Sequence, residues 1–357
     1  MNKPPKLNKG DNVAIVSLSS GILGEASSKH QVEIGVGRLK SFGLNPIFMP
    51  NALKGLAYLN ENPKARAEDL KMAFADDSIK GIICAIGGDD TYRLLPYLVE
   101  DMTFLDDVKN NPKLFTGFSD TTINHLMFYK LGMTSYYGPN FLNDLAELDH
   151  KMLPYTYQSF RSYFNNSDKT NIPSSEIWYE ERADFSLDAV NTPRITHNEQ
   201  YGYEVLRGTD IVSGRLLGGC LESLYDLING ERYPEEKIIA QQYNLFPAIN
   251  EWRDKILFIE TSEETPRPVN FKKMLEALND LGIFEAVKAV LVGKPQNEVY
   301  YQEYKEILTE VTEKAQTPIM YNLNFGHAYP RAVIPYGLQA EINFDDKTLS
   351  IKESLFQ

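Results

Sequence analysis

The segment FTGFSDTT, residues 115–122, places a serine where an apolar run gives way to a helical pattern. The order strand, Gly-x-Ser-x, helix resembles the nucleophile elbow, a sharp turn that exposes the serine hydroxyl above a sheet. The match is partial, because Thr121 stands where that motif has its second glycine. Serine and aspartate are also favoured at helix N-termini. Ser119 is therefore either a nucleophile or the N-cap of the next helix.

A nucleophilic serine needs a base, and the chain has five histidines. His327 lies in NFGHAYP, directly after an apolar stretch and behind a glycine that lets the backbone turn. The remaining histidines fall in expected helices or polar stretches: His30, His125, His150 and His197. We expect His327 to be the base; the alternative is a loop histidine that caps a backbone group or faces water.

A catalytic histidine usually has a carboxylate that orients its ring and stabilises the imidazolium. Glu260 ends the apolar run ILFIE, where a carboxylate is costly unless it is paired or exposed. Glu263 and Glu264 follow closely, so an ordinary exposed acid at a strand end is the alternative.

The glycine pair Gly87-Gly88 follows another apolar run. Acyl transfer needs backbone N–H groups aimed at the developing oxyanion, and glycine lets the backbone approach the substrate closely. The N–H of Asp120, directly after Ser119, is the natural second donor. The alternative is a phosphate-binding loop, but neither G-x-G-x-x-G nor G-K-[ST] is present.

These candidate residues lie at the ends of expected strands. Strand and helix patterns alternate from residue 13 to 139 and again from about 203, which predicts parallel sheets. Loops that follow the strands of such sheets carry ligand-binding residues. Residues 163–205 are polar and lack periodicity, which is typical of a linker or extended loop region.

Composition excludes several classes of protein. The 357 residues suffice for two domains, and the formal charge of −13 argues against nucleic acid or an anionic membrane as partner. Cys84 and Cys220 lie in apolar contexts typical of reduced core residues. We find no signal peptide, no apolar run of spanning length and no H-E-x-x-H motif, so we expect a cytoplasmic protein without a metal site.

The sequence resembles the LD-carboxypeptidase and microcin C immunity family of serine peptidases. Eight short segments carry the resemblance and follow in the family's order: GDNVAIVSLSS, AIGGDDTYRLLPYL, FTGFSDTT, YYGP, GRLLGGCLESL, ILFIETSEE, VLVGKP and NLNFGHAYPRAVIPYG. The resemblance implies a Ser-Glu-His triad at Ser119, Glu260 and His327, with the N–H groups of Gly88 and Asp120 as the oxyanion hole.

The resemblance also implies an α/β fold in two parts. The expected N-terminal domain, residues 1–165, has a Rossmann-like or flavodoxin-like parallel sheet and carries the nucleophile. A linker or substrate loop at 166–204 leads to a smaller C-terminal α/β domain, 205–357, which supplies Glu and His, with the site at the interface. Members are commonly homodimers and need no cofactor or metal.

Two branches of this family compete. One trims D-amino acids from murein tetrapeptides, and the other hydrolyses processed microcin C and related aminoacyl nucleotides. The carboxypeptidase branch usually has Arg before the glycine pair and an aromatic after it, where this chain has Ile86 and Asp89, which favours the immunity branch. Trp178 is expected to stack on the nucleobase or, alternatively, to pack its loop. Cys220 replaces a frequent Asn, which puts the substrate in question.

The sequence thus predicts a serine hydrolase of small peptide-like or aminoacyl-nucleotide amides, with Asp89, Trp178 and Cys220 as substrate contacts. The alternatives are a murein tetrapeptide LD-carboxypeptidase and a non-catalytic protein that binds a peptide or nucleotide.

Overall fold

The computed structural model describes residues 1–357, and the chain divides into two compact units. The N-terminal unit comprises Met1–Asn166, Arg182–Arg194 and Phe356–Gln357. The C-terminal unit comprises Ser167–Glu181 and Ile195–Leu355. The segment 166–204, expected to be one linker, therefore contributes residues to both units. No helix is both long and apolar enough to cross a membrane.

Five strands of the N-terminal unit form a parallel sheet in the order β5-β4-β3-β1-β2. Their bounds are β1 Asn12–Val16, β2 Asn45–Phe48, β3 Ile79–Cys84, β4 Leu114–Gly117 and β5 Tyr136–Tyr137. This is the doubly wound flavodoxin-like order, in which the chain reverses direction across the sheet between β1 and β3. The predicted α/β fold is confirmed, because apolar runs such as NVAIV are buried strands.

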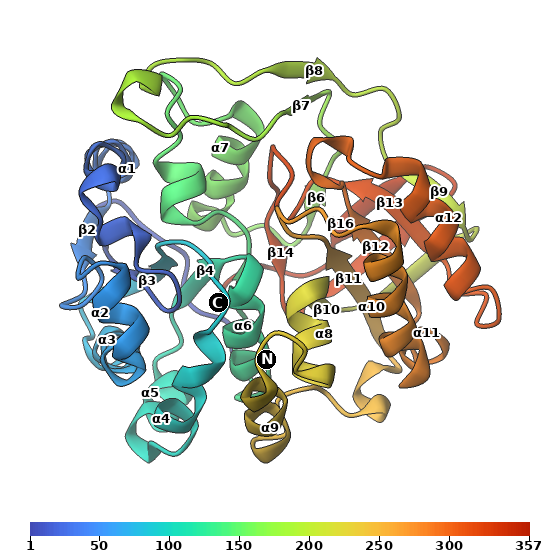
Figure 1. Cartoon of the computed structure of the whole chain (residues 1–357), viewed down its shortest axis with the longest axis horizontal. Coiled ribbons are helices and arrows are strands. Elements are labelled where there is room, and N and C mark those ends of the chain that lie inside the picture. The colour runs from blue at the N-terminus through green and yellow to red at the C-terminus, as the bar shows by residue number, and fades with distance from the viewer. The chain divides into compact units, whose positions relative to one another are not determined.

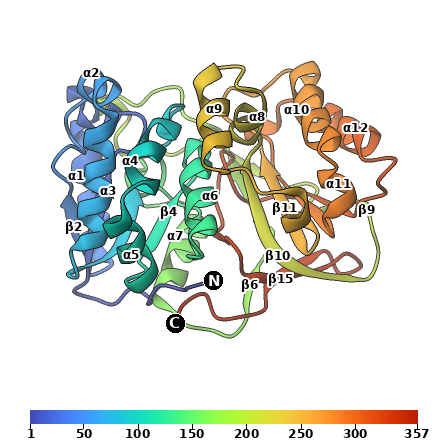
Figure 2. The same cartoon turned by 90° about the horizontal axis from the view of Figure 1, so that it is seen from below.

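Helices connect these strands (Figure 1). Their bounds are α1 Lys29–Ser41, α2 Leu56–Glu61, α3 Pro63–Ala75, α4 Leu95–Val99, α5 Met102–Asn110, α6 Thr122–Lys130 and α7 Pro154–Arg161. Local sequence explains where several begin: Pro63 occupies the first turn of α3, and the Asp101 side chain caps α5. The two termini of the chain lie side by side, with the Gln357 N–H donating to the Pro4 carbonyl (Figure 2).

The C-terminal unit is built on an eight-stranded sheet in the order β6-β16-β15-β10-β11-β12-β13-β9. The four central strands are parallel: β10 Ile211–Cys220, β11 Lys255–Glu260, β12 Ala289–Gly293 and β13 Ile319–Leu323. The outer strands pair antiparallel: β6 Thr170–Ile172, β9 Glu204–Arg207, β15 Gln339–Asn343 and β16 Thr348–Ile351. The carboxyl ends of β10, β11 and β13 thus lie at one edge of this sheet.

The helices of this unit are α8 Leu221–Asn229, α9 Pro234–Gln242, α10 Pro268–Asp280, α11 Ile283–Ala286 and α12 Tyr301–Val311. Figure 1 shows α8, α10 and α12 beside the central strands. A short strand β14, Ile334–Pro335, follows β13.

The polar middle segment is more regular than a linker. It contains β6 and a two-stranded antiparallel sheet of β7 Ile177–Tyr179 and β8 Thr196–Asn198. Strand β6 lies near the start of the C-terminal unit and pairs with β16, which lies near its end. A strand of three residues with so distant a partner gives no repeating pattern in its own segment, so the sequence predicts a loop here.

Candidate active site

Ser119 lies on the tight turn between β4 and α6, and its backbone is in the left-handed region at φ 68°. A residue other than glycine rarely adopts this conformation, and such strain clusters at functional sites. Phe118 is the N-cap of the short helical turn Ser119–Thr121 and Thr121 is the N-cap of α6, so Ser119 caps neither. The N-cap alternative therefore fails, and the geometry is that of a nucleophile elbow.

Buried hydrogen bonds hold this turn in place. The Ser119 N–H donates to the Tyr137 hydroxyl at 3.0 Å, and His125 Nε2 lies 3.0 Å from the Gly117 carbonyl oxygen. Burial lowers the pKa of His125 to about 3, so the ring is neutral, and Nε2 must carry the proton that it donates to Gly117. His125 therefore supports the turn and has no free nitrogen with which to act as a base there, since Nδ1 bonds Ser135.

The glycine pair packs directly against this turn. A Cβ atom on Gly87 would lie 2.7 Å from the Ser119 Cβ, so no other residue fits. Gly88 has φ 149°, and a Cβ there would lie 2.2 Å from Ser19 Oγ. The Gly88 N–H makes no hydrogen bond within the protein, which leaves it available to an oxyanion.

A buried ion pair that sequence reasoning missed anchors the glycine loop. Arg66 of α3 binds both carboxylate oxygens of Asp90 at 2.5 and 3.0 Å. The same guanidinium donates to the Leu18 and Ser19 carbonyls in the loop after β1. Arg66 thereby joins the loops that follow β1 and β3. Nothing in the helical sequence around Arg66 distinguishes it from a surface arginine, so no sequence signal reveals this role.

Asp120 connects the glycine loop to the serine turn. Its carboxylate accepts a hydrogen bond of 2.9 Å from the Thr91 N–H, and burial raises its pKa to about 6. Asp89, by contrast, is exposed. The Asp120 carboxylate therefore fixes the relative position of the two loops, and its own backbone N–H begins the helical turn.

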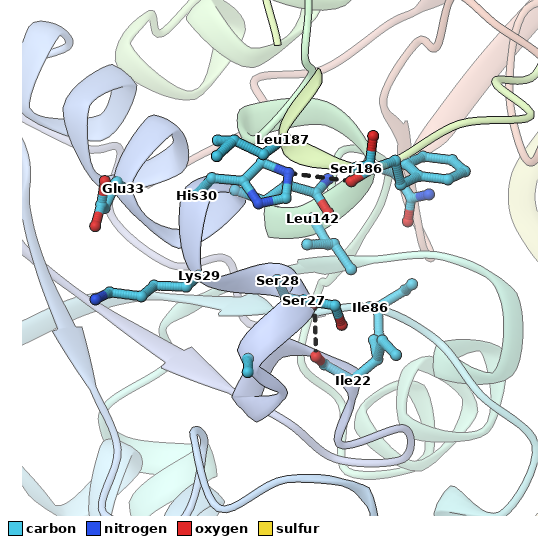
Figure 3. A pocket seen from close by; sticks show the side chains of 14 residues that line it. Ile22, Ser27, Ser28, Lys29, His30, Glu33, Ile86, Leu142, Ser186 and Leu187 are labelled. Atoms are coloured by element: carbon cyan, nitrogen blue, oxygen red, sulfur yellow. Dashed lines mark hydrogen bonds between the residues drawn. The ribbon is translucent and has the colours of Figure 1, made fainter. Parts of the chain in front are cut away.

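A mostly apolar cavity of about 870 Å³ opens beside the glycine loop (Figure 3). Its lining includes Ile22, Ser28, His30, Ile86, Leu142 and Leu187. The residues at 22–33 follow β1 and Ile86 follows β3, so the cavity lies at the point where the strand order reverses. Ligands of doubly wound sheets bind at this position.

The C-terminal unit brings Glu260 and His327 together. Glu260 ends β11, and His327 lies in the loop after β13; their side chains are 0% and 7% exposed. His327 Nδ1 lies 2.8 Å from Glu260 Oε2, and the His327 N–H donates to the same oxygen at 3.0 Å. Gly326, at φ 82°, makes room for this pair, because a Cβ there would lie 2.2 Å from the Glu260 Cγ.

The second ring nitrogen of His327 is also paired. Its Nε2 lies 3.0 Å from Glu263 Oε2. Burial alone would lower the pKa of His327, but the carboxylates of Glu260 and Glu263 outweigh it and raise that pKa to about 10. The hydrogen bond from His327 lowers the pKa of Glu263 to about 2. The ring is therefore an imidazolium between two carboxylates.

Cys220 ends β10 and is the register partner of Glu260 in the parallel pair β10–β11. Both cysteines are buried free thiols, as predicted, and burial raises the pKa of Cys220 well above its usual value. Ligand atoms of Cys220, Glu260 and His327 all lie within 4.8 Å of one another, a spacing that suits a metal ion. Hydrogen bonds between Glu260 and His327 already account for the cluster, so we assign no metal to it.

Trp178 lies on β7 with 8% of its surface exposed. Its ring stacks on His197 with centroids 4.2 Å apart, and Lys294 Nζ lies 5.1 Å from the ring centroid. In this conformation the indole packs within its own unit and has little surface left for a nucleobase.

The predicted residues thus assemble in two sets. Ser119, Gly88 and Asp120 meet in the N-terminal unit. Glu260, His327 and Cys220 meet in the C-terminal unit. An elbow serine beside a glycine loop and a buried Glu–His pair are features of peptidases and related hydrolases.

The chain belongs to the LD-carboxypeptidase family. Residues 13–138 match the family's N-terminal domain, and residues 213–342 match its C-terminal domain. The predicted resemblance is therefore confirmed, and the chain is a member of a peptidase family.

Relatives of both branches resemble this chain. The solved structure of an MccF-like protein from Streptococcus pneumoniae in complex with AMP is 49% identical, with a TM-score of 0.91, and the match covers 96% of this chain and 98% of that one. The microcin C7 self-immunity protein MccF of Escherichia coli is 26% identical over 96% of this chain and 94% of its own. The putative carboxypeptidase YocD of Bacillus subtilis is 30% identical, with 93% of each chain covered.

Proposed function

We propose that this protein is a serine hydrolase of the microcin C immunity type, which cleaves the amide bond of aminoacyl-nucleotide compounds. The observation that carries the proposal is the strained turn at Ser119, packed against a glycine loop that keeps a free N–H at Gly88. Backbone strain of this kind clusters at active sites, ligand clamps and switch regions, and its place on a strand–turn–helix elbow favours a nucleophile.

In the proposed reaction, His327 removes the proton from Ser119 as the hydroxyl attacks the carbonyl carbon. Glu260 holds Nδ1 and stabilises the imidazolium that forms. The N–H groups of Gly88 and Asp120 stabilise the tetrahedral oxyanion. The imidazolium then protonates the leaving nitrogen, and water releases the acyl group from Ser119 by the same steps in reverse order.

The substrate class rests on the relatives and on the cavity. The MccF-like protein of Streptococcus pneumoniae binds AMP in its crystal structure. We propose that a nucleotide moiety occupies the cavity lined by Ile86 and Leu142, because that cavity lies at the reversal point of the sheet. Asp89, exposed at the same loop, and Cys220 remain proposed contacts of the substrate.

A murein tetrapeptide is the second candidate substrate. The burial of Trp178 against His197 favours it, because the indole is then a packing residue and no stacking platform for a base is in place. A relative from Bacillus subtilis, 24% identical, is named a probable murein peptide carboxypeptidase.

Mass-spectrometric product analysis of the purified protein with two substrates tests both candidates. One substrate is aspartyl sulfamoyl adenosine, and the other is a murein tetrapeptide that ends in D-Ala. Ser119→Ala is the blank, and we expect it to fold like the parent, because Ser119 is not the N-cap of the helical turn or of α6. Release of aspartate alone supports the immunity type, release of D-Ala alone supports the carboxypeptidase, and release that persists in Ser119→Ala contradicts the proposed nucleophile.

We also propose a homodimer, as the family resemblance implies. Light scattering coupled to size exclusion measures the mass directly, to be compared with 40.6 kDa for one chain.

A further inference from the structure

His327 is held by one fixed carboxylate and one movable carboxylate. Glu260 bonds Nδ1 and its side chain is 0% exposed. Glu263 bonds Nε2 and its side chain is 63% exposed, on the loop that joins β11 to α10. A buried strand-end residue cannot leave without moving the sheet, whereas an exposed loop side chain needs only a rotation.

This arrangement conflicts with the proposed role of His327 as a base. Nδ1 faces a carboxylate and carries a proton. If Nε2 also donates to a carboxylate, the ring is an imidazolium without a lone pair. Such a ring cannot accept the proton of a serine hydroxyl. The C-terminal unit therefore shows a resting form, and the bond between Nε2 and Glu263 must break before the ring can act.

The thiol of Cys220 and the carboxylate of Glu222 near the ring are already paired. The Cys220 thiol is neutral because burial raises its pKa, and it donates to Glu222. Glu222 in turn accepts from Ser262, so it is occupied.

The two nearby arginines are engaged as well. Arg331 donates to the backbone carbonyl of His327 and to that of Gly326. Arg232 pairs with Glu264. The charge of Arg232 also lowers the pKa of Glu263, but its ion pair is with Glu264, so we look to the substrate for the cation that draws Glu263 away from the ring.

We infer that Glu263 is a positioning residue that holds His327 in an inactive form, and that a cationic group of the substrate releases it. This inference rests on the proposed function. An aminoacyl compound with a free α-amine carries an ammonium group on the atom next to the carbonyl that is attacked. That ammonium pairs with Glu263, the pKa of the ring falls, and Nε2 gives its proton to bulk water. The lone pair left on Nε2 can then accept the proton of the Ser119 hydroxyl. The site then favours substrates with a free amine over their N-acylated forms.

The test uses Glu263→Ala with Glu264→Ala as the matched control. Glu264 is the adjacent acid and is also largely exposed, but it pairs with Arg232 and not with the ring. The probes are aspartyl sulfamoyl adenosine and its N-acetyl derivative, whose amine cannot be charged. The parent is expected to prefer the free amine. We expect kcat/KM for the N-acetyl compound at pH 7 to be at least about tenfold higher in Glu263→Ala than in the parent. The preference for the free amine over the N-acetyl compound then becomes smaller.

A second readout does not depend on turnover. In protein with isotope-labelled histidine, the resonance of His327 is identified by its loss in His327→Gln and is then titrated by NMR. An opposite charge in contact shifts a pKa by about 1–3 units, so we expect Glu263→Ala to lower the midpoint of His327 by that amount. The acid limb of the pH profile of kcat/KM should move by the same amount, since it reports the pKa of the base in the free enzyme.

The outcomes separate the inference from the function it rests on. If no variant hydrolyses either probe but the His327 midpoint still falls in Glu263→Ala alone, the proposed function is wrong and the contact that holds His327 is real. If hydrolysis depends on Ser119 but neither the midpoint nor the amine preference changes in Glu263→Ala, the inference is wrong. Equal changes in Glu264→Ala would show a general charge effect and would also overturn it.

Discussion

Gly326→Ala tests whether the Glu–His pair depends on the space that one glycine leaves. The added Cβ would lie 2.2 Å from Cγ, 2.3 Å from Cδ and 2.4 Å from Oε2 of Glu260. No real Cβ approaches a heavy atom this closely, so either Glu260 or the His327 loop must move. This carboxylate accepts hydrogen bonds from the backbone N–H and from Nδ1 of His327, and either movement breaks them.

The expected cost has two parts. Alanine at a left-handed φ costs about 1–2 kcal/mol, and overpacking a filled site adds about 1–3 kcal/mol. Loss of the carboxylate that orients a catalytic histidine lowers kcat by about 10⁴-fold in serine proteases. We therefore expect Gly326→Ala to lower the free energy of unfolding by about 2–5 kcal/mol and kcat by about 10³- to 10⁴-fold.

Gly282→Ala is the matched control in the same unit. Gly282 has φ 76°, but its Cβ would meet only Ile249 Cδ1, at 3.7 Å. The Gly282→Ala variant has the same backbone strain without the clash. Its free energy of unfolding should therefore fall by about 1–2 kcal/mol, and its kcat should stay unchanged. Urea unfolding and the mass-spectrometric assay measure both quantities. If Gly326→Ala keeps the activity of Gly282→Ala, Glu260 has no part in catalysis.

Three further predictions concern ionisable groups. Arg66→Leu should lower the free energy of unfolding by about 1–3 kcal/mol, measured in urea, because it removes the bidentate partner of Asp90 and leaves that carboxylate only Arg93 and Ser19; a loss below about 0.5 kcal/mol would contradict this. The pKa of His327, about 10, lies above that of an unfolded histidine, so its stabilisation is complete below about pH 6.5 and is lost as the pH rises toward 10; the stability difference between the parent and His327→Gln should shrink over that range. Burial raises the pKa of Cys84 to about 12, and neither Cys84 nor Cys220 should react with a disulfide reagent until the chain is unfolded.

The sequence alone determined the strands and the candidate residues, because both depend on local pattern. Runs such as ILFIE and KGIIC are buried strands, and chemistry-bearing residues stand where those runs end. The pair Gly87-Gly88 follows one such run and predicts a close backbone approach to the substrate, and Gly326 permits a turn before His327. The α/β class and the family follow from these local patterns taken in order.

Only the tertiary structure decided what each residue does in its surroundings. The left-handed backbone of Ser119 removes the N-cap alternative, and the ring of His197 covers Trp178. Arg66 anchors the glycine loop from a distant helix, and Glu263 occupies the nitrogen that His327 needs. Each of these contacts joins residues apart in the chain, or depends on a backbone angle, and no spacing in the sequence encodes either.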